Sequence, residues 1–388
     1  MKLFRNSLCL TTSLLLTFSS VHAKEFLVGV ELPLSGSYAR AGKGNLEGIT
    51  IAAEMFNKHN PKHKIKLVTI DDESSPAKAQ AAVEKLAGQG VVAVTGGYST
   101  TVTGAGATAA NKAGLVYMTH GAPGKDILER GFKTFFRINN TEGYTTAISG
   151  LLGDMGVKSV SIVTSSLQAT AEVANDVKKD MAAKGVKVTV HTFDPGTADF
   201  KSIINKIKLQ DRSEAIFMSA LENDYVGIIR AAKVLKPNIK ALVGLWSLAT
   251  PKMATDFPDL MINVFGTAML PYPAEFKTQE GKEFVETCKR LYNKPPDYLA
   301  QLGYVQAQVL FEAIRLADEK GTLTKGGLPA ELRKTNRDTL IGHVSFDKNG
   351  DNPNFQQWIG QHQAGGKIPL VWPKDRSNVN MKYPALPW

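Results

Sequence analysis

Residues 91–123 read VVAVTGGYSTTVTGAGATAANKAGLVYMTHGAP, and this stretch decides the fold class. Its β-branched apolar start predicts a strand over residues 91–95, and its end predicts a second strand over residues 115–119. Between them, a run of small residues predicts a helix over residues 99–113 that stops at Gly114. The order strand, turn, helix, strand is typical of a parallel α/β sheet.

The turn between the first strand and the helix carries polar groups that suit an anion. Gly96 and Gly97 end the strand, and Ser99, Thr100 and Thr101 open the helix. A helix N-terminus has backbone N–H groups without helical partners, and hydroxyls beside them add further donors. We therefore expect a seat for a carboxylate at Ser99 and Thr100. The alternative is plain capping of the helix, which is the commoner use of Ser and Thr at this place.

The first 23 residues predict a cleavable export signal. Lys2 and Arg5 precede the apolar run LCLTTSLLLTF, and the sequence Val-His-Ala that ends at Ala23 has the small-x-small pattern of a signal peptidase site. A buried N-terminal helix is the alternative, but it does not explain the basic flank and the cleavage pattern together. The mature chain would begin at Lys24. We expect no transmembrane segment in it, because no other apolar run approaches the roughly 20 residues that span a bilayer.

Length and composition predict two domains and no disulfide. Without the signal, the chain of 388 residues keeps 365, which is more than one hydrophobic core usually serves. Cys288 is then the only cysteine left. The excess of basic over acidic residues falls from 10 to 8 when Lys2 and Arg5 are removed. Because no run of five like charges occurs, a nucleic-acid surface is not expected, although the excess favours acidic ligands or an anionic membrane face.

Strands and helices alternate along most of the chain. Further strands are predicted at residues 25–32 and 65–70, and then, after residues 135–138, at 158–164, 186–193, 215–219, 239–246 and 261–267. Two successive sets of this kind imply an α/β fold with two doubly wound parallel-sheet lobes. Ligands of such sheets bind beyond the carboxyl ends of the strands, so we expect the site in the turns that follow them. Helices over residues 278–292 and 298–318 and a tail of short strands complete the chain.

Seven segments together carry a resemblance to a known family. They are VGVELPLSGSYARAG (28–42), VVAVTGGYST (91–100), AGLVYMTHGAPGKDILERG (113–131), FRINN (136–140), DPGTADF (194–200), PPDYLAQLGYVQAQVLFEAI (295–314) and TLIGHVSFDKNGDN (339–352). In this order and spacing the chain resembles the type I periplasmic binding proteins of the branched-chain amino acid and amide group. These proteins are the capture components of ABC importers, and the resemblance spans nearly the whole mature chain.

The resemblance implies two lobes joined by three crossovers that close on a ligand like a hinge. Lobe one would comprise residues 24–140 plus 270–345, and lobe two residues 141–269 plus 346–388. The crossovers would fall near residues 139–142, 268–271 and 346–350. The resemblance further implies a periplasmic monomer without catalytic residues, cofactor, metal or nucleic acid. Its partners would be a small-molecule ligand and an ABC permease complex at the inner membrane.

The resemblance also implies ligand contacts in lobe one. Ser99 and Thr100 match the family's hydroxyl-bearing turn, which grips the ligand carboxylate. His120, Gly121 and Ala122 fall on the second ligand loop, where the family typically supplies a backbone carbonyl and a hydroxyl. Pro123 occupies that hydroxyl position here, and His120 is our candidate to replace the missing anchor.

Lobe two departs further from the family pattern. Ala169 stands at or beside the position where the family often has a ligand-stacking Tyr. Leu221, next to Glu222, occupies another position that is usually aromatic, and Trp246 lies where amino-acid binders commonly carry a carboxylate. A buried ammonium without a carboxylate costs several kcal/mol. We therefore expect a carboxylate-bearing metabolite that need not be an amino acid. Flat apolar side chains that would suit an aromatic ligand, or else pack the lobes, are Tyr38, Tyr98, Trp246 and Tyr272.

Three alternatives stay open. If the lobe-two residues were matched to the family's ligand positions one helical turn away, Glu222 could hold an ammonium group. The ligand would then be a branched-chain or other amino acid, or an amide. A sensor that presents its closed form to a receptor would use the same lobes. An enzyme is the least supported class, because Gly104-x-Gly106-x-x-Ala109 resembles a dinucleotide fingerprint but lies inside a predicted helix rather than in a strand-helix turn.

Overall fold

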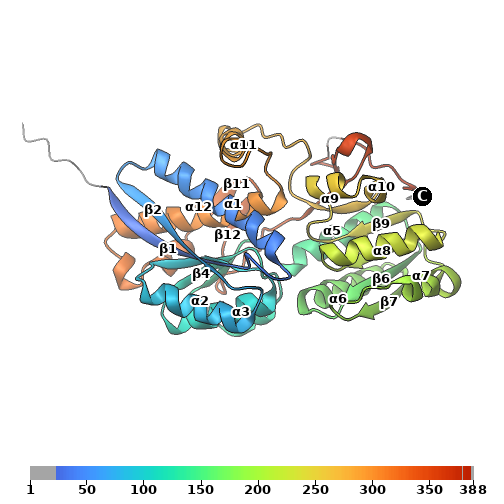
Figure 1. Ribbon diagram of the computed structural model, residues 1–388, viewed down its shortest axis with the longest axis horizontal. Helices are drawn as coiled ribbons and strands as arrows, with labels where there is room; N and C mark the ends of the chain where they lie inside the picture. Colours follow the sequence, from blue (N-terminus) through green and yellow to red (C-terminus); the bar gives the residue numbers. More distant parts are fainter. Residues whose placement is uncertain (1–22, 378, 386–388) are drawn as a thin grey trace, which may run out of the picture.

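The computed structural model describes residues 23–377 and 379–385. Two lobes lie side by side along the long axis of the molecule (Figure 1). We call the first lobe the part built on a five-stranded sheet and the second lobe the part built on a seven-stranded sheet. The export signal is predicted for residues that fall almost wholly outside this described range. Among the described helices, none is long and apolar enough to cross a membrane.

The first lobe contains an all-parallel sheet in the order β2-β1-β3-β4-β5. Its strands are β1 (Lys24–Leu32), β2 (His63–Asp71), β3 (Ala93–Gly96), β4 (Val116–Thr119) and β5 (Phe135–Arg137). Alternate residues of β1 face opposite sides: Val28 and Val30 join one core, while Leu27 packs against another. This two-sided burial explains why inner strands such as β1 read as largely apolar runs, unlike the edge strand β2.

Helices cover both faces of this sheet. On one face lie α1 (Ala39–His59), α11 (Gln279–Tyr292) and α12 (Tyr298–Glu319), and on the other α2 (Pro76–Gly88) and α3 (Thr100–Lys112) (Figure 1). The helices α1 and α12 touch closely at Gly48, where a Cβ atom would lie 2.0 Å from the carbonyl oxygen of Ala300. Short helices α4 (Asp126–Glu129) and α13 (Leu328–Leu332) and the 3₁₀ turn η2 (Leu323–Lys325) also belong to this lobe.

The second lobe has a mixed sheet in the order β14-β13-β10-β9-β8-β6-β7. Its parallel strands are β6 (Ser159–Ser165), β7 (Lys187–Phe193), β8 (Ala215–Ser219), β9 (Ala241–Gly244) and β10 (Phe265–Ala268). The tail adds β13 (Trp358–Gln361) and β14 (Leu370–Trp372), which pair antiparallel. The helical elements around this sheet are α5 (Thr141–Asp154), α6 (Gln168–Ala183), α7 (Lys201–Lys206), η1 (Ile207–Asp211), α8 (Glu222–Leu235), α9 (Pro251–Asp256), α10 (Pro258–Met261) and η3 (Ala364–Gly366).

The chain passes between the two sheets three times. It leaves the first lobe between β5 and α5, and returns between β10 and α11. It leaves again after a hairpin of β11 (Asn336–Thr339) and β12 (Gly342–Ser345), on the way to β13. This connectivity confirms the predicted fold class of two doubly wound lobes.

The strands begin and end within two residues of where the sequence predicts them, with one exception. The strand at residues 215–219 is confirmed to the residue as β8, whereas the strand predicted from residue 261 begins only at Phe265. Residues 258–261 form α10 instead, because Pro258 is well placed at the first turn of a helix and Asn263 then turns the chain with a φ of +65°.

Candidate ligand-binding site

A cavity lies between the lobes, beyond the carboxyl ends of strands from both sheets. The volume available in it to the centre of a water molecule is about 50 Å³. Nine of the twelve predicted site residues line it: Tyr38, Tyr98, Ser99, Thr100, His120, Gly121, Ala169, Leu221 and Trp246. The structure adds Thr101, Pro123, Asn139, Tyr144, Leu167, Gln168, Thr170, Tyr298 and Leu299.

The hydroxyl-bearing turn between β3 and α3 forms one end of the cavity. Ser99 precedes α3 with a φ of +72°, a conformation that non-glycine residues rarely adopt, and its side chain does not cap the helix. Gly97 makes this tight turn feasible, because a Cβ atom there would lie 2.6 Å from both Thr103 Oγ1 and Tyr117 OH. The capping alternative therefore does not describe Ser99.

Thr100 joins this turn to the second ligand loop. Its side chain is buried, and Oγ1 accepts a hydrogen bond of 3.2 Å from the backbone N–H of Gly124. The loops also touch at Gly121, where a Cβ atom would lie 2.0 Å from the carbonyl oxygen of Gly97. A residue larger than glycine at position 121 would push the two ligand loops apart.

His120 and Asn139 place polar atoms in the cavity wall. His120 is 3% exposed, and burial lowers the pKa of its imidazole to about 3, so the ring is neutral at physiological pH. Within the described part of the chain, His120 Nε2 and Asn139 Oδ1 are buried without a hydrogen-bond partner. Buried polar atoms usually have partners. These two atoms are therefore suited to hydrogen-bond a ligand.

Aromatic side chains from both lobes form the remaining wall. The rings of Tyr144 and Trp246 meet edge to face with their centres 5.4 Å apart, and those of Tyr38 and Tyr98 lie 5.9 Å apart. Tyr144 OH lies 2.7 Å from Tyr298 OH and accepts a hydrogen bond of 3.0 Å from Asn139 Nδ2. Burial raises the pKa of Tyr144 to about 12, and so its phenol stays neutral.

The sequence reasoning missed Tyr144, Tyr298 and Asn139. Tyr144 lies in the first turn of α5, directly after the first crossover, and Tyr298 begins α12 after its capping residue Asp297. A usable signal was present for Tyr144 alone, because it lies in the first turn of a helix that directly follows a chain segment leading from one lobe to the other.

Three predicted residues do not line this cavity. Ala122 is buried behind the loop, and its carbonyl oxygen faces Arg137 at 3.3 Å. Tyr272 pairs through its backbone with Ile368 and lines a separate small pocket. Glu222 faces a larger adjoining groove and forms an ion pair with Arg40.

No aspartate, glutamate, lysine or arginine lines the cavity among residues 23–377 and 379–385. The nearest candidate, Glu222, is already paired with Arg40, which also lies 3.9 Å from Asp297. The arrangement is thus a neutral, largely aromatic chamber with hydroxyls and a helix N-terminus at one end. Its position between two lobes suits it to hold a small molecule, and fold and cavity together define a two-lobed binding protein.

Comparison with known proteins identifies the family. Residues 26–367 match the family described as periplasmic binding protein, and the chain belongs to this family of solute-binding components of ABC transporters. It is similar to the leucine-, isoleucine-, valine-, threonine- and alanine-binding protein of Pseudomonas aeruginosa, with 23% identity over 370 residues and 94% of each chain covered. It is also similar to the Leu/Ile/Val-binding protein homolog 8 of Brucella abortus, with 23% identity and coverage of 90% and 91%.

Solved structures share the fold. The LivJ protein of Streptococcus pneumoniae in complex with isoleucine aligns with a TM-score of 0.78 and 22% identity, over 90% of this chain and 100% of that one. A solute binding protein from R. palustris in complex with benzoate aligns with a TM-score of 0.78 and 21% identity, over 93% and 97%. These two neighbours carry chemically different ligands on one fold, and so the side chains of the cavity must decide the ligand.

Proposed function

We propose that this protein captures a small aromatic carboxylate between its lobes and delivers it to an ABC permease. The observation that carries the proposal is the pairing of a hydroxyl-bearing helix N-terminus with an otherwise neutral aromatic chamber. An anion is stabilised at a helix N-terminus by free backbone N–H groups and the helix dipole. The ring of the same ligand would lie against Tyr144 and Trp246.

The carboxylate would be held by Ser99, Thr100 and His120. The Thr100 hydroxyl accepts from Gly124 and still has its own proton to donate. A neutral His120 that carries its proton on Nε2 would donate to the same carboxylate. Each such charge-assisted hydrogen bond is stronger than one between neutral groups.

The charge of the cavity wall argues against an α-amino acid. An ammonium group bound in the chamber would find no carboxylate among the described lining residues, and an unpaired buried charge costs several kcal/mol. Glu222 would have to give up Arg40 and turn toward the cavity to serve it. A benzoate-like ligand needs neither change.

The amino-acid alternative has one observation in its favour. Relatives that cover almost the whole chain are named for leucine, isoleucine and valine binding. In that case Glu222 would exchange its partner Arg40 for the ligand's ammonium group.

We also infer where the protein acts and in what form: cleavage after Ala23 releases a monomer into the periplasm, without enzymatic activity or cofactor. The lobes would comprise residues 24–140 plus 270–345 and residues 141–269 plus 346–388, as the resemblance implies.

The test is a binding screen on residues 24–388, after unfolding and refolding to remove any bound ligand. Benzoate at about 100 times its dissociation constant should stabilise the protein by about 2.7 kcal/mol in thermal unfolding. Benzamide removes the negative charge, and phenylalanine adds an ammonium group, so both should stabilise the protein far less. Stabilisation by leucine but not by benzoate would overturn the proposal in favour of the amino-acid alternative.

A further inference from the structure

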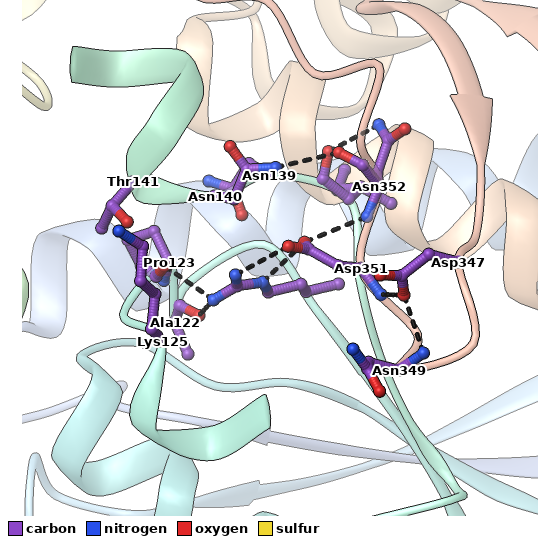
Figure 2. A network of polar contacts seen from close by, with 12 residues as sticks. Ala122, Pro123, Lys125, Asn139, Asn140, Thr141, Asp347, Asn349, Asp351 and Asn352 are labelled. Carbon is purple, nitrogen blue, oxygen red and sulfur yellow. Dashed lines mark hydrogen bonds and ion pairs between the residues drawn. The ribbon is translucent and has the colours of Figure 1, made fainter. Parts of the chain in front are cut away.

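Arg137 ends β5 and is 1% exposed, so its charge is almost wholly buried. Its guanidinium forms a forked ion pair with Asp351: Nε lies 2.8 Å from Oδ1 and Nη2 lies 2.9 Å from Oδ2 (Figure 2). A planar guanidinium matches a carboxylate in this two-point geometry, which fixes its orientation.

The remaining nitrogen of Arg137 faces the second ligand loop. Nη1 donates to the backbone carbonyl oxygen of Pro123 at 2.6 Å and lies 3.3 Å from that of Ala122 (Figure 2). It also donates to the carbonyl oxygen of Gly124 at 2.7 Å. These carbonyls directly follow His120 and Gly121, which line the cavity. Residues 120–125 lie between β4 and α4 and belong to neither. The guanidinium therefore takes the place of regular structure in holding this loop.

Asp351 belongs to the third crossover, which is tied to the first. Asp347 Oδ1 accepts from the backbone N–H of Asp351 at 3.0 Å and so holds the turn. Asn352 Nδ2 donates to the carbonyl oxygen of Ile138 at 3.0 Å, and Asn140 Nδ2 donates to that of Asn352 at 2.9 Å (Figure 2). Two of the three hinge segments are thus joined beside Arg137.

The other end of the loop reaches the second lobe. The backbone N–H of Lys125 donates to Glu172 Oε2 at 3.1 Å, and its Nζ lies 3.0 Å from Asp176 Oδ2. Both acceptors are on α6. One short segment is therefore in contact with the cavity, the hinge and the opposite lobe.

We propose that Arg137 is a positioning residue that fixes the second ligand loop to the hinge, so that closure of the lobes and the placement of His120 against the ligand are coupled. The inference deepens the proposed function and rests on it. Arg137 does not line the cavity, and it acts on the ligand only through the loop.

The test is hydrogen exchange by mass spectrometry on ligand-free protein, residues 24–388. Arg137→Lys keeps the charge but loses the fork, and Asp351→Asn removes the anchor more than 200 residues away in sequence. Both should speed exchange about tenfold in the peptide of residues 119–125, as expected for loss of a charge-assisted hydrogen bond. Exchange in α2 and α8 should not change. If Arg137 only stabilised the fold as a whole, the substitutions would instead speed exchange throughout the chain.

A matched control is Arg315→Lys, which breaks a forked pair with Glu312 within α12. It should leave the 119–125 peptide as in the wild type. If Asp351→Asn fails to fold, Asp347→Ala loosens the same turn without leaving a buried charge unpaired. Unchanged exchange of the loop in the anchor variant, or faster exchange spread evenly over both lobes, overturns the inference.

Benzoate titration by calorimetry separates the two proposals. If the wild type binds benzoate, Arg137→Lys should raise the dissociation constant about tenfold while Arg315→Lys leaves it unchanged. An equal dissociation constant in wild type and Arg137→Lys would overturn the coupling. If the wild type does not bind benzoate, the proposed ligand is wrong, and the exchange result still decides whether Arg137 holds the loop.

Discussion

The hydroxyl of Ser99 is the side chain on which the carboxylate seat most directly depends. We expect Ser99→Ala to weaken benzoate binding roughly 10- to 100-fold, because a hydrogen bond to a charged group is worth about 1.5–3 kcal/mol. Calorimetric titration measures the change. Thr108→Ala removes a hydroxyl from the same helix away from the cavity lining and should bind as the wild type does. Equal affinity of Ser99→Ala and wild type would exclude Ser99 from the site.

His120 should make the folded protein sensitive to acid. Burial lowers the pKa of its imidazole from 6.5 to about 3, so below pH 6.5 the unfolded chain binds a proton that the folded chain does not. The stability that this histidine contributes is complete above pH 6.5 and decreases by about 1.4 kcal/mol per pH unit as the pH falls toward 3.

Urea unfolding of the wild type and His120→Gln at pH 7, 6, 5 and 4 measures this effect. As the pH is lowered below 6.5, the free energy of unfolding should fall less steeply in His120→Gln than in the wild type, by about 1.4 kcal/mol per pH unit. His59→Gln replaces an exposed histidine and serves as the control. If the free energy of unfolding fell with pH at the same rate in wild type and His120→Gln, the pKa of His120 would not be lowered in the folded protein.

Among the structural elements, α5 depends on a cap that also belongs to the hinge. Asn140 Oδ1 accepts from the N–H of Gly143 at 2.9 Å, and its Nδ2 donates to the carbonyl oxygen of Asn352. Asn140→Ala should lower the free energy of unfolding by about 2 kcal/mol, about half from the cap and half from the second hydrogen bond.

Two variants separate these contributions in urea unfolding. Asn140→Asp keeps the side-chain oxygen that accepts from Gly143 but loses the donor to Asn352. It should therefore recover only the stability that comes from the cap. Thr278→Ala removes the cap of α11, which accepts from Gly281 at 3.1 Å, and should cost only about 1 kcal/mol. A loss in Asn140→Ala no larger than in Thr278→Ala would mean that the tie to the third crossover adds nothing.

In the molecule as a whole, ion pairs join the lobes on both sides of the cavity. Arg40 on α1 pairs with Glu222 on α8, and Lys125 pairs with Asp176 on α6. Pairs at such partly exposed positions are worth at most about 1 kcal/mol each. Together they should nevertheless shift an equilibrium between open and closed lobes, because only contacts present in one state can do so.

We expect the ligand-free double variant Arg40→Met/Lys125→Met to have a larger radius of gyration than the wild type in small-angle X-ray scattering. In the wild type, 1 M salt should act in the same direction, because it screens both pairs. The control Lys58→Met/Lys320→Met removes two pairs that lie inside the first lobe and should leave the radius unchanged. Equal radii for the two double variants would contradict a role of these pairs in closure.

The sequence by itself determined the fold class, most strands and the hydroxyl-bearing turn. These features depend on local properties: runs of apolar residues, glycines at tight turns and hydroxyls at a helix start. Gly97 and Ser99 illustrate this, because they lie two residues apart in the same turn between β3 and α3. The nine predicted residues that line the cavity come mostly from such turns.

Only the tertiary structure decided which side chains meet across the cleft. Tyr144 and Tyr298 share a hydrogen bond although 154 residues separate them, and Arg40 pairs with Glu222 across 182 residues. Position in the sequence was equally uninformative, because Leu221 lines the cavity while its neighbour Glu222 does not. Leu221 precedes α8 with an extended backbone, whereas Glu222 is the first residue of the helix, and their side chains therefore point in different directions. Local patterns fix the elements, whereas the packing of the two lobes fixes the partners of each charge and thereby the chemistry of the site.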